Sequence, residues 1–370
     1  LCSDVESASG DNFGEAQACL DRHYDRLSAD CKAIRKKEIA LRHAAPELEA
    51  RVQLHCGAEI VSVCDSSVDT FTEATLECLV QHLYDSEVSQ LCQRAVLDVQ
   101  RESRSDIAFA PDVAIACKSV IQLKCGGKQQ LRCLQDLFER RDQTLVADLN
   151  CHSKLAKLAH DSARDINVDV GAAADCKDDI NHFCVGVKYG RGRIHQCLRE
   201  NLESLKPACL KAEFSQIRSE GGDASLMPSL RHRCAKDLAE LCSTKHNGQS
   251  DLSCLLSSKS KLDQDCASAM LAAQKVASTD IRLNTDLFEA CFDHIPTLCG
   301  ETLAFSIIEY EFNEAADKHD HEVTKGGIVD CLVQNRHKIP GGAALCSANI
   351  VEVIQSRYEN IDLDPTLSAA

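Results

Sequence analysis

The cysteines are the residues of this chain whose type and spacing could do chemistry. There are 23 of them in 370 residues, and regularly spaced thiols can bind metal ions, exchange disulfides or form structural disulfides. In every complete group of four, the second cysteine lies eight positions after the first, and 25 positions always separate a fourth cysteine from the next first one. Chance does not repeat two such spacings, so the chain is a tandem repeat. The groups are Cys2, Cys19, Cys31; Cys56, Cys64, Cys78, Cys92; Cys117, Cys125, Cys133, Cys151; Cys176, Cys184, Cys197, Cys209; Cys234, Cys242, Cys254, Cys266; and Cys291, Cys299, Cys331, Cys346.

The spacing favours disulfides over metal binding. Zinc ligands and redox-active thiols usually come in pairs with two to four residues between them, and no Cys-x-x-Cys occurs here. We therefore expect neither a zinc site nor a thiol-disulfide oxidoreductase. Disulfides at this density are typical of an oxidising compartment.

The repeat frame also makes a prediction for both ends of the sequence. The first group lacks its first cysteine, which the frame would place before Leu1, and the next first cysteine would be residue 371. We interpret the odd cysteine count as an effect of truncation, with Cys2 a candidate for the unpaired residue. A free or intermolecular Cys2 is the alternative, and the partner of Cys31 is left open.

Three helices must position the cysteines of each repeat. The first pair lies on an apolar-periodic segment that often follows a proline (helix A), and the third cysteine lies in a Cys-Leu pair on a second helix (helix B). A third helix (helix C) runs from the fourth cysteine for about 12–15 residues, with Ser28, Ser86 and Asp263 as candidate N-caps and Pro207 in a first turn. It ends in a recurring linker, Asp106-Ile107, Asp165-Ile166, Asp280-Ile281 and Asn360-Ile361.

The predicted fold is therefore all-α: tandem disulfide-stapled three-helix repeats of about 57–61 residues that form an extended array. The expected boundaries are a partial first repeat over 1–45, complete repeats over 46–106, 107–165, 166–223 and 224–280, a sixth repeat over 281–359 with an insertion at 300–330, and the start of another repeat at 360–370.

Helix geometry limits the disulfide pairing. Cysteines eight apart on one helix are about 12 Å apart along its axis, whereas a disulfide needs Cα atoms within about 7 Å. The first and second cysteines therefore cannot pair unless helix A is broken. We favour nested pairing, first with fourth and second with third, and the crossed pairing is the alternative. Applied to every group, the nested pairing gives Cys2–Cys19, in place of an unpaired Cys2, together with Cys56–Cys92, Cys64–Cys78, Cys117–Cys151, Cys125–Cys133, Cys176–Cys209, Cys184–Cys197, Cys234–Cys266, Cys242–Cys254, Cys291–Cys346 and Cys299–Cys331.

Three further segments are candidate binding elements, each with a more ordinary reading as a solvated loop or packing element. His319-Asp320-His321-Glu322 could bind a transition metal. The insertion that contains Tyr310 and Phe312 could bind a partner. The basic turn with Lys188, Arg191 and Arg193 could bind a sulfated glycan or an acidic ligand. No cofactor is expected.

Composition and motifs exclude several classes of function. The net charge of −16 argues against nucleic acid as a partner. No apolar run is long enough to span a membrane, no Asn-x-Ser/Thr acceptor occurs, and no hydrolase, phosphate-loop or metalloprotease motif is present. We therefore expect a protein that is not an enzyme.

The fourth repeat carries a family resemblance. Its pattern is Cys176-x7-Cys184, a Gly-rich turn, then Cys197-Leu198-x2-Asn201-x3-Leu205-x3-Cys209, with Asp179-Ile180 and Phe183 before the second cysteine. This pattern resembles the cysteine-rich repeat of the Golgi apparatus protein 1 family, and the resemblance extends over nearly the whole chain. The sixth repeat departs from it through its insertion, and the third through its short turn.

The resemblance implies a function. Members of the family are type I membrane glycoproteins of the Golgi and secretory route, whose lumenal repeats precede one transmembrane helix and a short tail. It implies binding of fibroblast growth factors, a role in their trafficking, and a role as E-selectin ligand through attached glycans. We thus expect a lumenal scaffold that binds secreted basic proteins. We expect the protein in the Golgi membrane, at the cell surface or secreted. Its contact with the membrane would come only through a segment outside this sequence. The oligomeric state stays open, and the alternative is a structural spacer without a ligand site.

Overall fold

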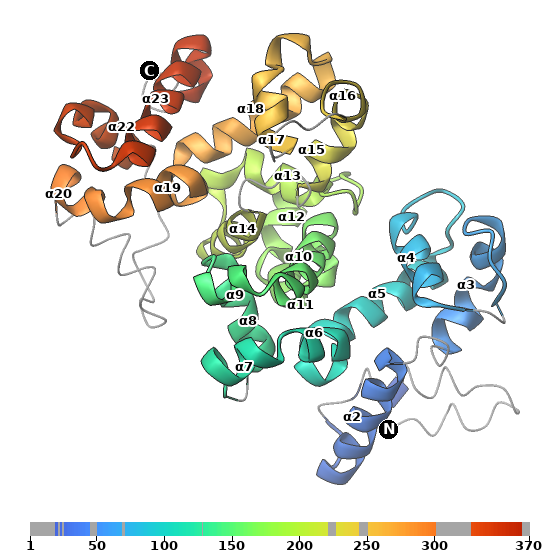
Figure 1. The fold of residues 1–370 in the computed structure, drawn as a ribbon. Helices are drawn as coiled ribbons and strands as arrows, with labels where there is room; N and C mark the ends of the chain where they lie inside the picture. The colour runs from blue at the N-terminus through green and yellow to red at the C-terminus, as the bar shows by residue number, and fades with distance from the viewer. Residues whose placement is uncertain are drawn as a thin grey trace, which may run out of the picture. The chain divides into compact units, whose positions relative to one another are not determined.

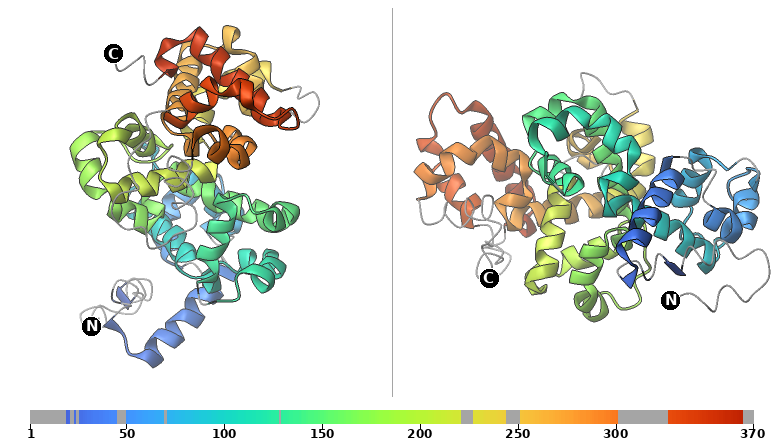
Figure 2. Two further views of the ribbon diagram at one scale, coloured as in Figure 1. Left: turned by 90° about the vertical axis from the view of Figure 1, so that its left-hand side faces the viewer. Right: turned by 90° about the horizontal axis from the view of Figure 1, so that it is seen from below.

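The computed structural model describes residues 19–20, 23, 26–44, 50–68, 71–127, 129–220, 227–243, 251–300 and 327–364. All regular structure in these ranges is α-helix or short 3-10 helix, as Figures 1 and 2 show, so the predicted all-α fold is confirmed. The chain divides into two compact units, residues 1–158 with 167–169, and residues 159–166 with 170–370.

The helices follow the repeat frame. The first unit holds α2 (Ala29–Ala44), α3 (Ala50–Ser62), α4 (Glu73–Gln81), α5 (Gln90–Ser105), η4 (Ile107–Phe109), α6 (Pro111–Ala116), α7 (Lys118–Lys124), α8 (Gln130–Glu139) and α9 (Gln143–Ala147). Two elements run from one unit into the other, α10 (Leu149–Arg164) and η5 (Ile166–Val168).

The second unit continues the same order. It holds α11 (Val170–Asp175), α12 (Lys177–Phe183), α13 (Arg193–Glu200), η6 (Leu202–Ser204), α14 (Pro207–Glu220), α15 (Pro228–Arg233), α16 (Ala235–Leu241), α17 (Asp251–Ser257), η8 (Lys259–Lys261), α18 (Gln264–Thr279), η9 (Ile281–Leu283), α19 (Thr285–Cys291), η10 (Phe292–His294), α20 (Ile295–Cys299), α22 (Gly327–Gln334), η11 (Arg336–Lys338), α23 (Ala344–Glu359) and η12 (Ile361–Leu363).

Helix A is bent at the first cysteine in four of the five complete repeats, which the sequence did not predict. Cys117, Cys176, Cys234 and Cys291 have ψ angles of 12°, 0°, 9° and −4°, against about −42° in an α-helix. The hydrogen-bond ladder is kept at the bend, since the Cys117 N–H donates to the carbonyl of Val113 at 2.8 Å. In the fourth, fifth and sixth repeats the half before the bend packs on helix C, and in all four repeats the half after it packs on helix B.

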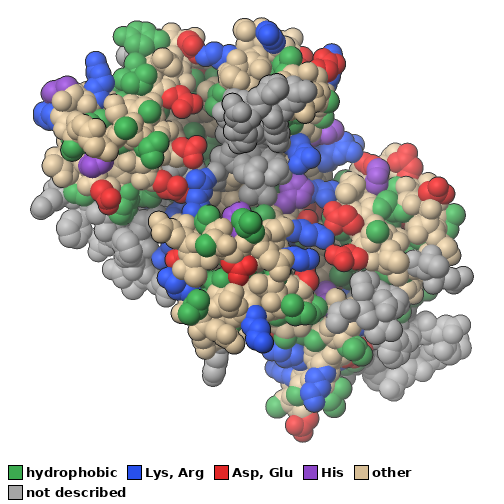
Figure 3. All heavy atoms as spheres, in the orientation of Figure 1, with side chains coloured by type: hydrophobic (Ala, Val, Ile, Leu, Met, Phe, Trp, Pro, Cys, Tyr) green, Lys and Arg blue, Asp and Glu red, His purple; other side chains and the backbone are tan. Residues whose placement is uncertain are grey.

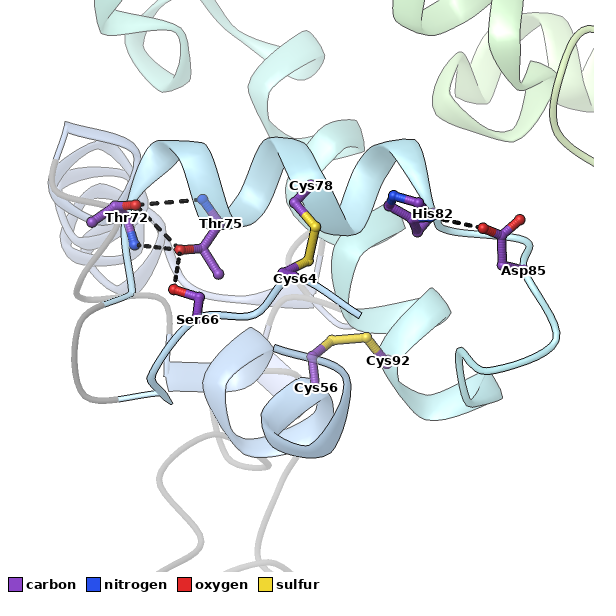
Figure 4. Close-up of a disulfide and its surroundings, with 9 residues drawn as sticks. All are labelled: Cys56, Cys64, Ser66, Thr72, Thr75, Cys78, His82, Asp85 and Cys92. Carbon is purple, nitrogen blue, oxygen red and sulfur yellow. Dashed lines mark hydrogen bonds and ion pairs between the residues drawn. A yellow bond between two sulfur atoms is a disulfide. The ribbon is translucent and has the colours of Figure 1, made fainter. Parts of the chain in front are cut away.

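The disulfides of the described residues are nested. In the second repeat Cys56 is bonded to Cys92 and Cys64 to Cys78, as Figure 4 shows. The outer bonds join helix A to helix C with Cα–Cα distances of 4.5 to 4.8 Å. The inner bonds join the end of helix A to helix B. The remaining bonds are Cys117–Cys151, Cys125–Cys133, Cys176–Cys209, Cys184–Cys197, Cys234–Cys266, Cys242–Cys254, Cys291–Cys346 and Cys299–Cys331.

In the first group, Cys19 is disulfide-bonded and Cys31 is free. Cys31 is thus the free cysteine among the residues that the structure describes. Cys2 itself lies outside them.

The leucine after each third cysteine explains the Cys-Leu pairs. In all five complete repeats this side chain has no exposed surface. A cysteine on helix B faces the inner disulfide, and the next residue points about 100° away, which is toward the core between helices A, B and C. These residues are Leu79, Leu134, Leu198, Leu255 and Leu332.

Helix C begins with a side-chain cap on the fourth cysteine. Ser28, Ser89, Asp148 and Asp263 each lie three residues before a fourth cysteine and accept its backbone N–H at 2.9 to 3.3 Å. The predicted caps Ser28 and Asp263 are therefore confirmed, and Pro207 is the first residue of α14. The predicted cap Ser86 is wrong, because a turn continues to Val88 and Ser89 caps α5.

A buried acid also holds the start of helix C in three repeats. Glu59, Asp179 and Asp237 each lie three residues after a first cysteine, and each is at most 5% exposed. They accept the backbone N–H groups of Ser89, Lys206 and Asp263 at 2.9, 3.1 and 3.0 Å. Burial disfavours the charge of Glu59, but its hydrogen bonds with Ser89 outweigh that effect and lower the pKa of its carboxyl.

The linkers after α5, α18 and α23 each pack back onto helix C of the preceding repeat. In the linker after α18, the Arg282 guanidinium lies 5.0 Å from the centre of the Phe214 ring on α14. In the last linker, Asp362 pairs with Lys275 of α18 at 2.9 Å. Asp106, Asp280 and Asn360 begin these linkers and accept a backbone N–H two residues ahead. The recurring Asx-Ile pattern thus joins successive repeats.

Candidate binding site

The fourth repeat, residues 166–223, contains the only predicted partner-binding residues that the structure describes. They lie on the turn between α12 and α13, where Gly186, Gly190 and Gly192 have φ of 81°, 78° and 70°. Arg191 also has a positive φ of 55°. Four left-handed residues within seven positions fold the turn tightly, and this is why the segment is rich in glycine.

The three basic side chains of this turn differ in their surroundings. Lys188 and Arg191 are exposed. Arg193 instead donates from its Nε to the Lys188 carbonyl at 3.0 Å, and from its Nη2 to the Tyr189 carbonyl. Burial and the nearby charge of Arg191 lower the pKa of Arg193. Arg193 therefore holds the turn in shape, and Lys188 and Arg191 are the residues presented to solvent.

The remaining candidate residues belong to the insertion of the sixth repeat. Tyr310, Phe312 and the His319–Glu322 segment lie outside the described residues. Within the ranges that are described, no group of three or more His, Cys, Asp or Glu side chains is arranged to hold a metal ion.

Beside the turn lies a group of four buried charged side chains that the sequence did not reveal: His195, Arg199, Glu213 and Glu220. The imidazole of His195 is hydrogen-bonded at Nδ1 to Glu213 (2.6 Å) and at Nε2 to the carbonyl of Ser162 (3.0 Å). Arg199 donates from Nε to Glu213 (3.1 Å) and from both terminal nitrogens to the two oxygens of Glu220 (2.8 and 2.7 Å). The four residues come from α13 and α14. His195, Glu213 and Glu220 are at most 4% exposed, and the Arg199 side chain is 18% exposed.

The charges of this group support one another. Burial disfavours the charged forms of His195, Arg199 and Glu213. The carboxylate of Glu213 nevertheless raises the pKa of His195, and Glu220 with Glu213 raises that of Arg199. In turn, the charges and hydrogen bonds of His195 and Arg199 outweigh the effect of burial on Glu213 and lower the pKa of its carboxyl. These shifts favour the charged forms of His195, Arg199 and Glu213.

A cavity of about 750 Å³ borders this group in the second unit. His195, Arg199 and Glu220 form part of its wall, and the rest is mostly apolar. The chain has two methionines, and both, Met227 and Met270, line the cavity. Cavities of this size are in the range of ligand pockets.

Comparisons with known proteins agree with the repeat frame. A family model described as "Cysteine rich repeat" (Cys_rich_FGFR) matches residues 90–142, 149–206 and 264–340. No solved structure matches the chain. None of the helices in the described ranges is long and apolar enough to cross a membrane.

The curated relatives are much longer than this chain. Golgi apparatus protein 1 of Homo sapiens is 26% identical over 367 residues, which cover 96% of this chain and 30% of the relative. The Gallus gallus protein of the same name is 26% identical over 371 residues, 96% of this chain and 31% of the relative. The Golgi apparatus protein 1 homolog of Caenorhabditis elegans is 24% identical over 317 residues, 79% of this chain and 27% of the relative.

Proposed function

Because the chain belongs to the cysteine rich repeat family, we propose that it is a non-enzymatic binding scaffold of the Golgi and secretory route. Its ligands in this proposal are basic secreted proteins of the fibroblast growth factor class, whose trafficking it influences. The proposal places the repeats on the lumenal side of the membrane, where disulfides persist.

The proposal is supported by repeats that disulfides hold rigid, in a chain with a large negative charge. Two disulfides fix each complete repeat, and the chain has a net charge of −16. Acidic and basic side chains are interspersed on the face drawn in Figure 3. Attraction for a basic partner therefore comes from the summed field, which raises association rates and is screened by salt.

This proposal can be tested by measuring the binding of a basic fibroblast growth factor to the purified chain as the salt concentration rises from about 50 mM to about 500 mM. We expect binding at low salt that weakens as salt rises. The chain after reduction and alkylation with iodoacetamide keeps its net charge but loses its disulfides, so it separates binding by the folded repeats from binding by charge alone. Absence of binding at low salt would overturn the proposal and favour the structural spacer.

The exposed residues of the basic turn are a second element of the proposal. Lys188 and Arg191 would contact an acidic group, such as a sulfated glycan carried with the growth factor. The aromatic residues Tyr310 and Phe312 would add partner contacts from the insertion. Substitution of Lys188 and Arg191 by Ala, with Lys177→Ala as a control, should weaken binding of a sulfated glycan.

A further inference from the structure

The imidazole of His195 is enclosed by hydrogen-bond acceptors on both sides. Its Nδ1 faces a carboxylate oxygen of Glu213, and its Nε2 faces the carbonyl oxygen of Ser162. Neither oxygen can donate a proton while Glu213 is ionised. A neutral imidazole has one N–H and one lone pair, so it would leave one of these contacts without a hydrogen. Only the doubly protonated ring satisfies both.

The remaining charges around the ring fit the same protonation state. From α14 the ring meets Glu213 and Glu220, and from its own helix it meets Arg199. From α10 it meets a backbone carbonyl. Helix α18 also contacts α13, and its Lys275 pairs with Asp362. With His195 protonated the two cations balance the two carboxylates, whereas loss of its proton leaves one buried negative charge uncompensated.

The position of this group gives the protonation a structural effect. Ser162 lies in the last turns of α10, and His195 and Glu213 lie on α13 and α14. The imidazole therefore joins the end of the third repeat to the fourth repeat, within the second unit. A second bond supports this junction, since the Gly192 N–H donates to the carbonyl of Arg164 at 2.9 Å.

We propose that His195 is a pH-sensitive clasp, which holds the end of α10 on the fourth repeat when its imidazole is protonated and weakens that attachment when the proton is lost. The raised pKa of His195 agrees with the geometry. A group whose pKa is raised on folding stabilises below its unfolded pKa of about 6.5, and this stabilisation is lost as the pH rises through the folded value. The clasp is therefore closed in mildly acidic solution and loosens toward alkaline pH.

Hydrogen exchange of the 370-residue chain between about pH 6 and pH 9 tests the clasp, after correction for the intrinsic pH dependence of exchange. Because one proton is involved, the opening equilibrium of residues 159–166 should rise by up to about tenfold per pH unit above pH 6.5. His195→Gln should remove this pH dependence. His182→Gln, an exposed histidine of the same repeat, should keep it.

An NMR titration of the imidazole nitrogens provides a readout that needs no variant. We expect both His195 nitrogens to be protonated at pH 6.5. A neutral ring at that pH, or opening of residues 159–166 that does not change between pH 6 and pH 9, would overturn the proposal even if His195→Gln fails to fold.

Discussion

Asp179 allows a quantitative test of the buried acids that hold helix C. Its side chain is 3% exposed, and its Oδ2 accepts the Lys206 N–H at 3.1 Å. Asp179→Ala removes a hydrogen bond to a carboxylate and leaves a partly buried N–H without this acceptor, which costs about 2 kcal/mol. Asp179→Asn keeps a neutral acceptor and should cost about 1 kcal/mol.

The assay is hydrogen exchange at the amide of Lys206. A loss of about 2 kcal/mol corresponds to roughly thirtyfold lower protection, and about 1 kcal/mol to roughly fivefold. Asp178→Ala is the matched control, because the adjacent exposed carboxylate contacts the same lysine only through its Nζ. Unchanged protection in Asp179→Ala, or an equal loss in Asp178→Ala, would refute the reasoning.

Three further predictions follow from the described residues. Folding lowers the pKa of Glu59, so its carboxylate stabilises the folded chain above the unfolded pKa of about 4.3, and this contribution is lost as the pH falls. The melting temperatures of Glu59→Gln and of the unchanged chain should therefore converge toward pH 3. Gly192→Ala should destabilise more than Gly186→Ala in denaturant unfolding, because both have positive φ but only at Gly192 would a Cβ meet backbone atoms, at 3.2 and 3.3 Å; equal losses would contradict this. N-Ethylmaleimide without reductant should label Cys31 and spare Cys19, and a labelled Cys19 peptide in a mass spectrum would show the assignment to be wrong.

Much of the fold could be predicted because regular intervals between the cysteines define the repeat. Five copies of two cysteine intervals mark the helices, and the leucine after each third cysteine marks the core. The bend at the first cysteine has no such signal, because the residues around it are ordinary helix formers. The acid three residues after the first cysteine was visible in three repeats as Glu59, Asp179 and Asp237, and could have been found by aligning them.

The His195 group could not be predicted in this way. Its contacts join residues 33 and 18 positions apart, His195 with Ser162 and with Glu213, and the contact with Ser162 depends on how successive repeats pack. His195 lies two residues before its third cysteine, a position where no other repeat has a histidine. A pattern that occurs once, across a junction, gives no periodic signal.

The caps at the start of helix C bear on how the disulfides form and exchange. The fourth cysteine lies in the first turn of helix C, as with Cys266, whose N–H is capped by Asp263. Helix N-termini stabilise a thiolate, and the thiol of lower pKa is the better leaving group in exchange. Attack on an outer disulfide should therefore release the sulfur of helix C and leave the attacking thiol bonded to the cysteine of helix A, so reduction of each repeat should begin with the same one of its two outer sulfurs.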